Sequence, residues 1–123
     1  NRSAYIMIGA LMIYHICKKS DWEKTNKSGE YRAESLLSQG FIHCSTLLQV
    51  SRVLATFYQG QSGLVLLVID PKQLNSPVKW EPGTDKPDEL FPHVFGPINT
   101  DAVGRVVAVH LNAQGSFEVP ILE

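Results

Sequence analysis

The sequence contains little cysteine, no cluster of basic residues and no long apolar run. Its 123 residues include two cysteines, Cys17 and Cys44, which show neither CxxC spacing nor a second pair. This pattern excludes a zinc ribbon and favours two reduced thiols that behave as small apolar side chains. We therefore predict a cytoplasmic protein without disulfides.

The distribution of charge argues against binding to nucleic acid. The chain has 11 Lys and Arg residues against 12 Asp and Glu residues, a formal net charge of −1. The lysines are scattered or, over residues 18–27, interleaved with acidic residues, which is typical of a solvated helix face. Since a nucleic-acid-binding surface needs a clustered basic face, we expect no nucleic-acid partner.

Apolar runs are too short for a membrane helix, which needs about 18 residues or more, so we expect no membrane insertion. Residues 1–11 are apolar but lack a clear basic region and an A-x-A cleavage site. We interpret them as an N-terminal extension and predict that residues 12–123 form one globular domain. With 44% hydrophobic residues, a domain of this size can build its core without a structural metal.

The pattern of apolar residues predicts an α+β fold. Strand-like runs lie at 12–17, 41–44, 64–70, 78–81 and 104–111. The proline-bounded segment 91–97 receives no strand assignment. Helices are predicted after a capping box at Ser20, before Gly40, and over residues 46–58 with Thr46 as the cap. Early helices and late strands indicate antiparallel or mixed β-sheets with two to three helices in the N-terminal half.

Three of the four histidines, His15, His43 and His93, lie in otherwise apolar strand or turn segments. Each by itself is typical of a buried structural histidine, and only their shared setting indicates a ligand cleft. His110, at the end of the last predicted strand, is interpreted as structural.

The strand that ends in FIHCS places polar groups on one face. Its period of two puts Phe41, His43 and Ser45 on one side, with Ile42 and Cys44 on the other. If the second pair faces the core, the first set faces a groove at the start of the next helix. Free backbone N–H groups at such a start suit a phosphate.

Glu81, next to Trp80 at a strand end, is the remaining candidate. Its carboxylate could accept hydrogen bonds from ribose hydroxyls or stabilise a developing cation. An exposed glutamate without a functional role is an equally good interpretation.

Two familiar catalytic arrangements do not match the sequence. His43 and Cys44 are neighbours in a strand and point to opposite faces, so they cannot form a Cys–His pair. A two-histidine phosphoesterase needs two H-x-[ST] motifs, and only the motif ending at Ser45 fits. No metal-ligand spacing supports the remaining cluster, so we predict no metal at His15, His43, His93 and Glu81.

Several separated motifs together resemble the bacterial domain-of-unknown-function family 952. In chain order they are IYHI at 13–16, Trp22, Tyr31, GFIHCS at 40–45, WE at 80–81 and FPHVFG at 91–96. The resemblance covers the chain from Met12 to about Leu111. That family carries no established activity that could be transferred to this chain.

The family in turn resembles the ADP-ribosyltransferase-like fold, in which two small antiparallel sheets enclose a nicotinamide dinucleotide cleft. This resemblance implies that His15 binds the adenosine-side ribose and that Glu81 takes the place of a catalytic glutamate. FIHCS is similar to a motif of tRNA 2′-phosphotransferases, which implies that His43 and Ser45 line the cleft. Ile-Cys follows His15 where those enzymes carry Gly-[ST], and Arg32 is the nearest candidate for their dinucleotide-binding arginine.

Two functional hypotheses follow from these observations. The first is a small enzyme with a cleft for NAD or an ADP-ribose-like nucleotide, active in ADP-ribosyl or phospho transfer, with His43 and Glu81 as catalytic residues. NAD is the candidate cofactor, although the residues alone specify none, and the nucleotide contacts come from His15, Tyr31, Ser45 and His93. The alternative is a non-catalytic module that binds a ligand or another protein. Oligomeric state is not indicated by the sequence.

Overall fold

The computed structural model describes residues 12–119, and the predicted extension at 1–11 lies outside the described residues. The strands are β1 (Ile13–Lys18), β2 (Glu30–Tyr31), β3 (Ile42–His43), β4 (Leu64–Ile69), β5 (Val78–Pro82), β6 (Leu90–Val94), β7 (Ile98–Asn99), β8 (Val103–Leu111) and β9 (Phe117–Glu118). The α-helices are α2 (Lys19–Lys24), α3 (Glu34–Gln39) and α4 (Val50–Phe57), with 3₁₀ turns at Thr25–Lys27, Leu47–Gln49, Pro71–Gln73 and Thr100–Ala102. The predicted α+β class, with its early helices and antiparallel strands, is confirmed.

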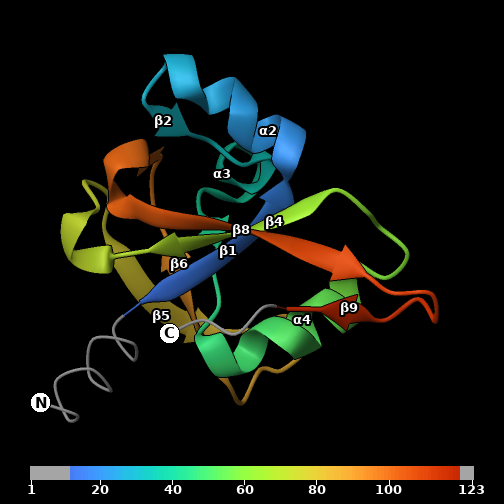
Figure 1. Ribbon diagram of the computed structural model, residues 1–123. Coiled ribbons are helices and arrows are strands. Elements are labelled where there is room, and N and C mark those ends of the chain that lie inside the picture. The colour runs from blue at the N-terminus through green and yellow to red at the C-terminus, as the bar shows by residue number, and fades with distance from the viewer. Residues whose placement is uncertain (1–11, 120–123) are drawn as a thin grey trace, which may run out of the picture.

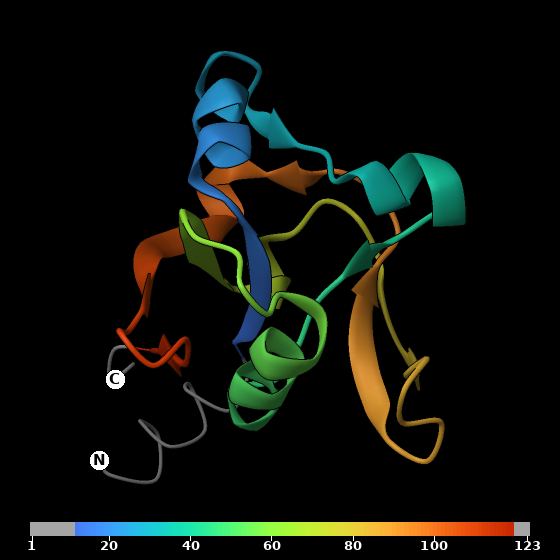
Figure 2. The same cartoon turned by 90° about the vertical axis from the view of Figure 1, so that its right-hand side faces the viewer.

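Two sheets and a short strand pair organise the chain. The largest sheet has the strand order β1-β4-β8-β9, the second has the order β3-β6-β5, and β2 pairs with β7 (Figure 1). All of these pairs are antiparallel. A backbone bridge connects the first two sheets, because Tyr14 and Ser45 exchange N–H to carbonyl hydrogen bonds of 2.8 and 2.7 Å. The β5–β6 hairpin stands apart from the large sheet (Figure 2).

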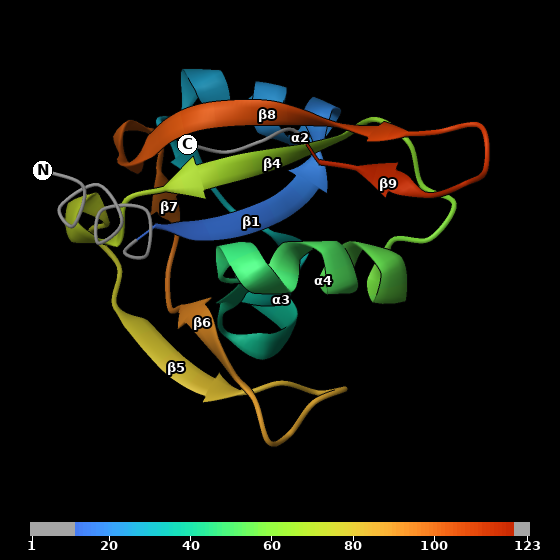
Figure 3. The same ribbon diagram turned by 60° about the horizontal axis from the view of Figure 1, so that its bottom comes forward.

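Apolar side chains cover both faces of β1 and β4 in the large sheet, whereas most residues of β8 are exposed. On one face, α4 contributes Val50 and Leu54 to a cluster that also contains Ile16 of β1. On the other face, Ile13 and Cys17 of β1 cluster with buried residues of β2, β3, β6 and β7. Figure 3 shows α4 lying along one side of this sheet. The run 12–17 has no plainly polar face for this reason, since both of its faces are buried.

The helix ends follow local signals in two of three cases. Gly40 ends α3 in the left-handed conformation with φ of +88°, as predicted. The predicted cap at Thr46 is also confirmed. The backbone N–H of Thr46 donates a hydrogen bond of 2.9 Å to Gln49 Oε1, as part of a capping box. The predicted cap at Ser20 is wrong: α2 begins at Lys19, directly after β1, without a side-chain cap. No helix within residues 12–119 is long and apolar enough to cross a membrane.

Strand β6 is not indicated by the sequence. It is the central strand of its sheet, between β3 and β5, although Pro92 lies in its middle. Proline lacks the N–H that a central strand needs and is therefore rare there. Here the Pro92 carbonyl still accepts a hydrogen bond of 3.1 Å from the Cys44 backbone N–H.

Both cysteines are free and buried. Burial raises the pKa of the Cys17 thiol to about 11, and it raises the pKa of Cys44 well above its ordinary value. The two thiols therefore stay protonated at neutral pH and act as apolar groups of the core.

Candidate functional site

A cavity of about 470 Å³ opens between β3, the end of α4 and the β5–β6 hairpin. This volume lies within the range typical of small-molecule sites, roughly 300–1,000 Å³. Aromatic rings form much of its wall, from Phe41, Phe57, Tyr58 and Phe91. Its polar lining includes Gln39, His43, Ser45, Thr84, Asp85 and His93.

Strand β3 and the residues after it bring two of the predicted polar residues to this cavity. Ile42 is fully buried and Cys44 is 3% exposed, and both belong to the core cluster. The alternation of the strand then turns His43 and Ser45 to the other side, where they line the cavity. His43 and Ser45 both line the cavity as predicted, but Cys44 also borders it and Ser45 is itself only 5% exposed, so the division of FIHCS into a core face and an open face holds only for Ile42 and His43.

His93 is a nearly buried histidine oriented by a carboxylate. Its Nδ1 lies 2.8 Å from Oε1 of Glu81, and the Glu81 side chain is partly exposed. An ionised carboxylate only accepts hydrogen bonds, so Nδ1 carries a hydrogen, and Nε2 is an acceptor in the neutral form of the ring. Within residues 12–119, Arg52 Nε is the only fully buried side-chain nitrogen or oxygen without a partner. The His93 Nε2 has no partner among these residues and is not one of their fully buried atoms, and His93 lines the cavity.

His43 faces His93 across the antiparallel pair of β3 and β6. The two imidazole centroids are 5.4 Å apart in an edge-to-face arrangement, and Phe41 stacks on His93 at 4.1 Å. His43 Nε2 lies 3.0 Å from Oε1 of Gln39, so Nε2 donates and Nδ1 is left as the acceptor. Burial and the neighbouring His93 lower the pKa of His43, which keeps this ring neutral at pH 7.

His15 and Tyr31 are paired with each other in the core and do not line the cavity. His15 Nδ1 donates to the backbone carbonyl of His43 at 2.6 Å, and its Nε2 accepts from the Tyr31 hydroxyl at 3.0 Å. Burial lowers the pKa of His15 to about 4. Both ring nitrogens are thus satisfied inside the protein, and His15 supports the backbone of β3 behind the cavity wall.

Tyr31 also borders a second hollow, of about 440 Å³, next to α2. Arg32, the arginine nearest to the expected dinucleotide position, lines this hollow and forms a 3.2 Å ion pair with Glu30. The structure therefore brings together His43, Ser45, His93 and Glu81, and it places His15, Tyr31 and Arg32 outside that group.

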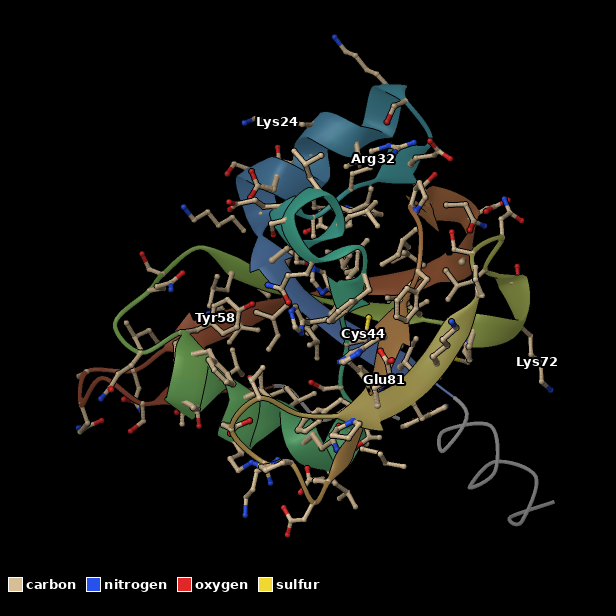
Figure 4. The ribbon with its side chains drawn as sticks, turned by 180° about the vertical axis from the view of Figure 1, so that it is seen from behind. Lys24, Arg32, Cys44, Tyr58, Lys72 and Glu81 are labelled. Atoms are coloured by element: carbon tan, nitrogen blue, oxygen red, sulfur yellow. The ribbon has the colours of Figure 1, made fainter. Side chains whose placement is uncertain are left out.

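The cavity has an acidic rather than a basic lining. Among residues 12–119, no Lys or Arg lines it, whereas Asp85 does and Glu81 stands behind His93. In Figure 4 the buried Cys44 and the partly exposed Glu81 lie near the middle of the view, while Lys24 and Lys72 project from its edges. The part of the lining within residues 12–119 supplies two imidazoles, the hydroxyls of Ser45, Tyr58 and Thr84, and aromatic faces, but no Lys or Arg side chain.

The β5–β6 loop, part of the cavity wall, is tied to α4 by contacts that sequence reasoning missed. Arg52 forms a two-point ion pair with Glu89, with one Nη1–Oε1 distance of 3.2 Å. Gln49 Nε2 donates to Glu89 and to the carbonyl of Leu90, both at 2.9 Å. These groups are 37 to 41 residues apart in the chain, so no local pattern signals the contact.

The aromatic lining was also hidden in the sequence. The spacing of Leu47, Val50, Leu54 and Phe57 predicts one apolar face of the helix over 46–58, but the Phe57 side chain is half exposed and lines the cavity. Only Val50 and Leu54 of that series are fully buried. The position of the Phe57 ring in the last turn of the helix is the one weak sequence signal that could have indicated an aromatic cavity wall.

Comparison with solved structures shows close relatives of the fold. The X-ray crystal structure of protein CC0527 from Caulobacter crescentus has a TM-score of 0.77 and 30% sequence identity, covering 87% of this chain and 93% of that chain. The solution NMR structure of the same protein has a TM-score of 0.73 and 30% identity, over 86% and 90% of the two chains. The comparison with curated proteins found no match.

The family comparison covers the same part of the molecule. Residues 16–106, which contain the cavity and both core clusters' central strands, match the profile described as "Protein of unknown function (DUF952)". The match includes FIHCS, Glu81 and His93, the segments on which the resemblance in the sequence rests. This chain therefore belongs to the DUF952 family.

Proposed function

We propose that the cavity binds a nucleotide of the NAD or ADP-ribose type and that His93, held by Glu81, exchanges a proton with it. The observation that carries this proposal is the Glu81–His93 pair, whose free Nε2 reaches an aromatic cavity opposite His43. The rings of Phe57 and Tyr58, which line the cavity, offer stacking surfaces for a base. The imidazole acceptors suit ribose hydroxyls.

The geometry supports acid–base chemistry at His93. Its Nε2 can accept the proton of a ribose or acceptor hydroxyl during ADP-ribosyl or phospho transfer. The Glu81 carboxylate then stabilises the imidazolium that forms and keeps the ring in the required tautomer. His43, neutral and 5.4 Å away between ring centroids, provides a second polar contact on the same ligand.

The resemblance of the motifs to the ADP-ribosyltransferase-like fold also supports the proposal, since that fold binds a dinucleotide between two small antiparallel sheets. Here two antiparallel sheets are joined through the Tyr14–Ser45 bridge, next to the cavity. In this proposal His15 and Tyr31 act as positioning residues, because they hold the backbone of His43 rather than the ligand. The cytoplasmic location stays a prediction.

Thermal unfolding of the full chain with millimolar NAD, ADP-ribose, AMP or adenosine tests the proposal. A ligand at one hundred times its dissociation constant adds about 2.7 kcal/mol, which is a shift of several degrees. We expect His93→Gln to weaken binding at least ten-fold, and His110→Gln, a change of an exposed histidine on β8, to leave it unchanged. The absence of any shift with all four compounds would refute the proposal.

Analysis of the bound compound separates the two functional hypotheses. A ligand that is converted by the wild-type protein, but not by Glu81→Gln, identifies an enzyme in which the Glu81–His93 pair is catalytic. A ligand recovered intact after hours identifies a non-catalytic binding module. The absence of cationic lining residues within 12–119 is the observation that favours this second function.

A further inference from the structure

The hydrogen-bond inventory of the cavity specifies what kind of chemical group can enter it. Within residues 12–119, the accessible imidazole nitrogens are His93 Nε2 and His43 Nδ1. In the neutral form of the two rings both nitrogens are acceptors, because the other nitrogen of each ring donates to Glu81 or Gln39. A ligand group placed between them must therefore donate hydrogen bonds.

The charges around the cavity act in the same direction. Asp85 lines it and Glu81 contacts His93 from behind, while no Lys or Arg within the described residues lines it. A phosphate or carboxylate in this position would lose its hydration, meet two acceptors and lie near acidic side chains. The cavity therefore excludes anionic groups because their hydrogen-bond acceptors stay unpaired and their charge is repelled, and not because they are too large.

The aromatic wall defines the shape of the group. Phe41 stacks on His93, and Arg52 lies over the buried ring of Phe91, which leaves Phe57 and Tyr58 to contact a flat ligand. Flat rings gain dispersion and quadrupole interactions against such walls. Phe57 is half exposed, so part of this surface has no partner within residues 12–119.

We infer that the cavity accepts an uncharged planar ring carrying N–H or O–H donors, and that the phosphates of a nucleotide remain outside it. This inference rests on the proposed function and defines the part of the ligand that the site recognises. Acceptor nitrogens of His43 and His93 receive the donors, and the acidic groups at Asp85 and Glu81 reject anions.

Two aromatic probes of equal size test this inference with the full chain. Benzamide presents N–H donors and no charge, whereas benzoate is an anion with acceptors only. In NMR titrations at pH 7.5, we expect benzamide to shift the backbone amides of His43, Ser45 and His93 in a saturable manner. We expect benzoate to bind at least ten-fold more weakly.

Two variants and one control show whether the discrimination comes from these groups. Asp85→Asn removes the acidic lining charge and should lower the ratio of the benzoate to the benzamide dissociation constant several-fold. Glu81→Gln removes the carboxylate that sets the His93 tautomer and should lower the same ratio. His110→Gln should leave the preference unchanged, and the amide spectra show directly that each variant is folded.

The histidine tautomers give a readout that needs no ligand. Long-range ¹H–¹⁵N spectra of the side chains should show His93 with its hydrogen on Nδ1. An Nε2–H tautomer, equal or tighter binding of benzoate, or no binding of benzamide would each overturn the inference. If the protein binds benzamide but none of the nucleotides, the inference is supported and the proposed function is refuted. If it binds a nucleotide but prefers benzoate to benzamide, the proposed function is supported and the inference is refuted.

Discussion

Acidification should destabilise this protein through His15, before its carboxylates are protonated. His15 is buried, its Nδ1 donates to the His43 carbonyl and its Nε2 accepts from the Tyr31 hydroxyl. A proton on Nε2 would break the second hydrogen bond and leave a charge in the core. Burial therefore lowers the pKa of His15 from 6.5 to about 4 in the folded chain.

The size of the effect follows from the difference between the two pKa values. Below pH 6.5 the unfolded chain binds a proton at His15 that the folded chain does not bind until about pH 4. The free energy of unfolding is thus fully retained above pH 6.5 and falls by about 1.4 kcal/mol per pH unit below it. The total loss by pH 4 is about 3 kcal/mol, against a typical stability of roughly 5–15 kcal/mol.

Other groups add to this dependence in the same direction. The pKa of His43 is also lowered, by burial and by His93, so it contributes in the same range of pH. The Arg52 ion pair lowers the pKa of Glu89, whose contribution is lost only below its ordinary value of 4.5. Measurements between pH 7 and pH 4.5 therefore report mainly on the histidines.

Urea denaturation of the wild type and of His15→Asn at several pH values measures the effect. The asparagine amide can still donate to the His43 carbonyl but cannot titrate, and it leaves the Tyr31 hydroxyl without its acceptor. We expect the variant to be less stable by about 1–3 kcal/mol at pH 7 and to lose that disadvantage towards pH 4.5. Equal pH dependence in both proteins, or a His15 ring signal that titrates above pH 6, would refute the reasoning. His110→Asn, the control, should keep the wild-type dependence.

Three further predictions concern the core and the turns. Leu54→Ala should cost about 2–5 kcal/mol in urea denaturation, because Leu54 is fully buried, and a loss below about 1 kcal/mol would contradict this. Gly40→Ala should cost roughly 1 kcal/mol at its positive φ, whereas Gly104→Ala, with open space around the added Cβ, should be close to neutral; equal effects would contradict the assignment. Cys17 and Cys44 should resist iodoacetamide at pH 8 until urea unfolds the chain, and rapid labelling of the folded protein would show that they are not core groups.

Strands with a strong local pattern could be predicted from the sequence. The runs that became β1, β4 and β8 are long and apolar, and β4 is buried on both faces of the large sheet. β6 could not be predicted, since Pro92 interrupts the pattern of a strand while the pairing with β3 and β5 stabilises it. The predicted helix start at Ser20 was wrong for a similar reason. Helix α2 follows β1 directly with Lys18 as its first flanking residue, so Ser20 already lies inside the helix.

The candidate site was predicted in part. His43 and Ser45 were assigned to a groove by alternation with Ile42, and the structure places them on the cavity wall. Helical spacing places Phe57 on the same apolar face as Val50 and Leu54, although its half-exposed ring lines the cavity. Spacing along a helix indicates which residues share a face, but not whether that face meets a sheet or an opening.

The sequence by itself determined the faces of each strand, because the alternation of side chains is a property of the local backbone. It separated Ile42, which is fully buried in the core, from His43, which lines the cavity, independently of every other element. Only the tertiary structure decided which side chains bind the histidines: His93 is hydrogen-bonded to Glu81, and His15 is hydrogen-bonded to Tyr31. The two residues of each pair are 12 and 16 positions apart in the chain and meet because the strands pack around a common core. Contacts between different elements therefore leave His93 at the cavity and enclose His15 in the interior.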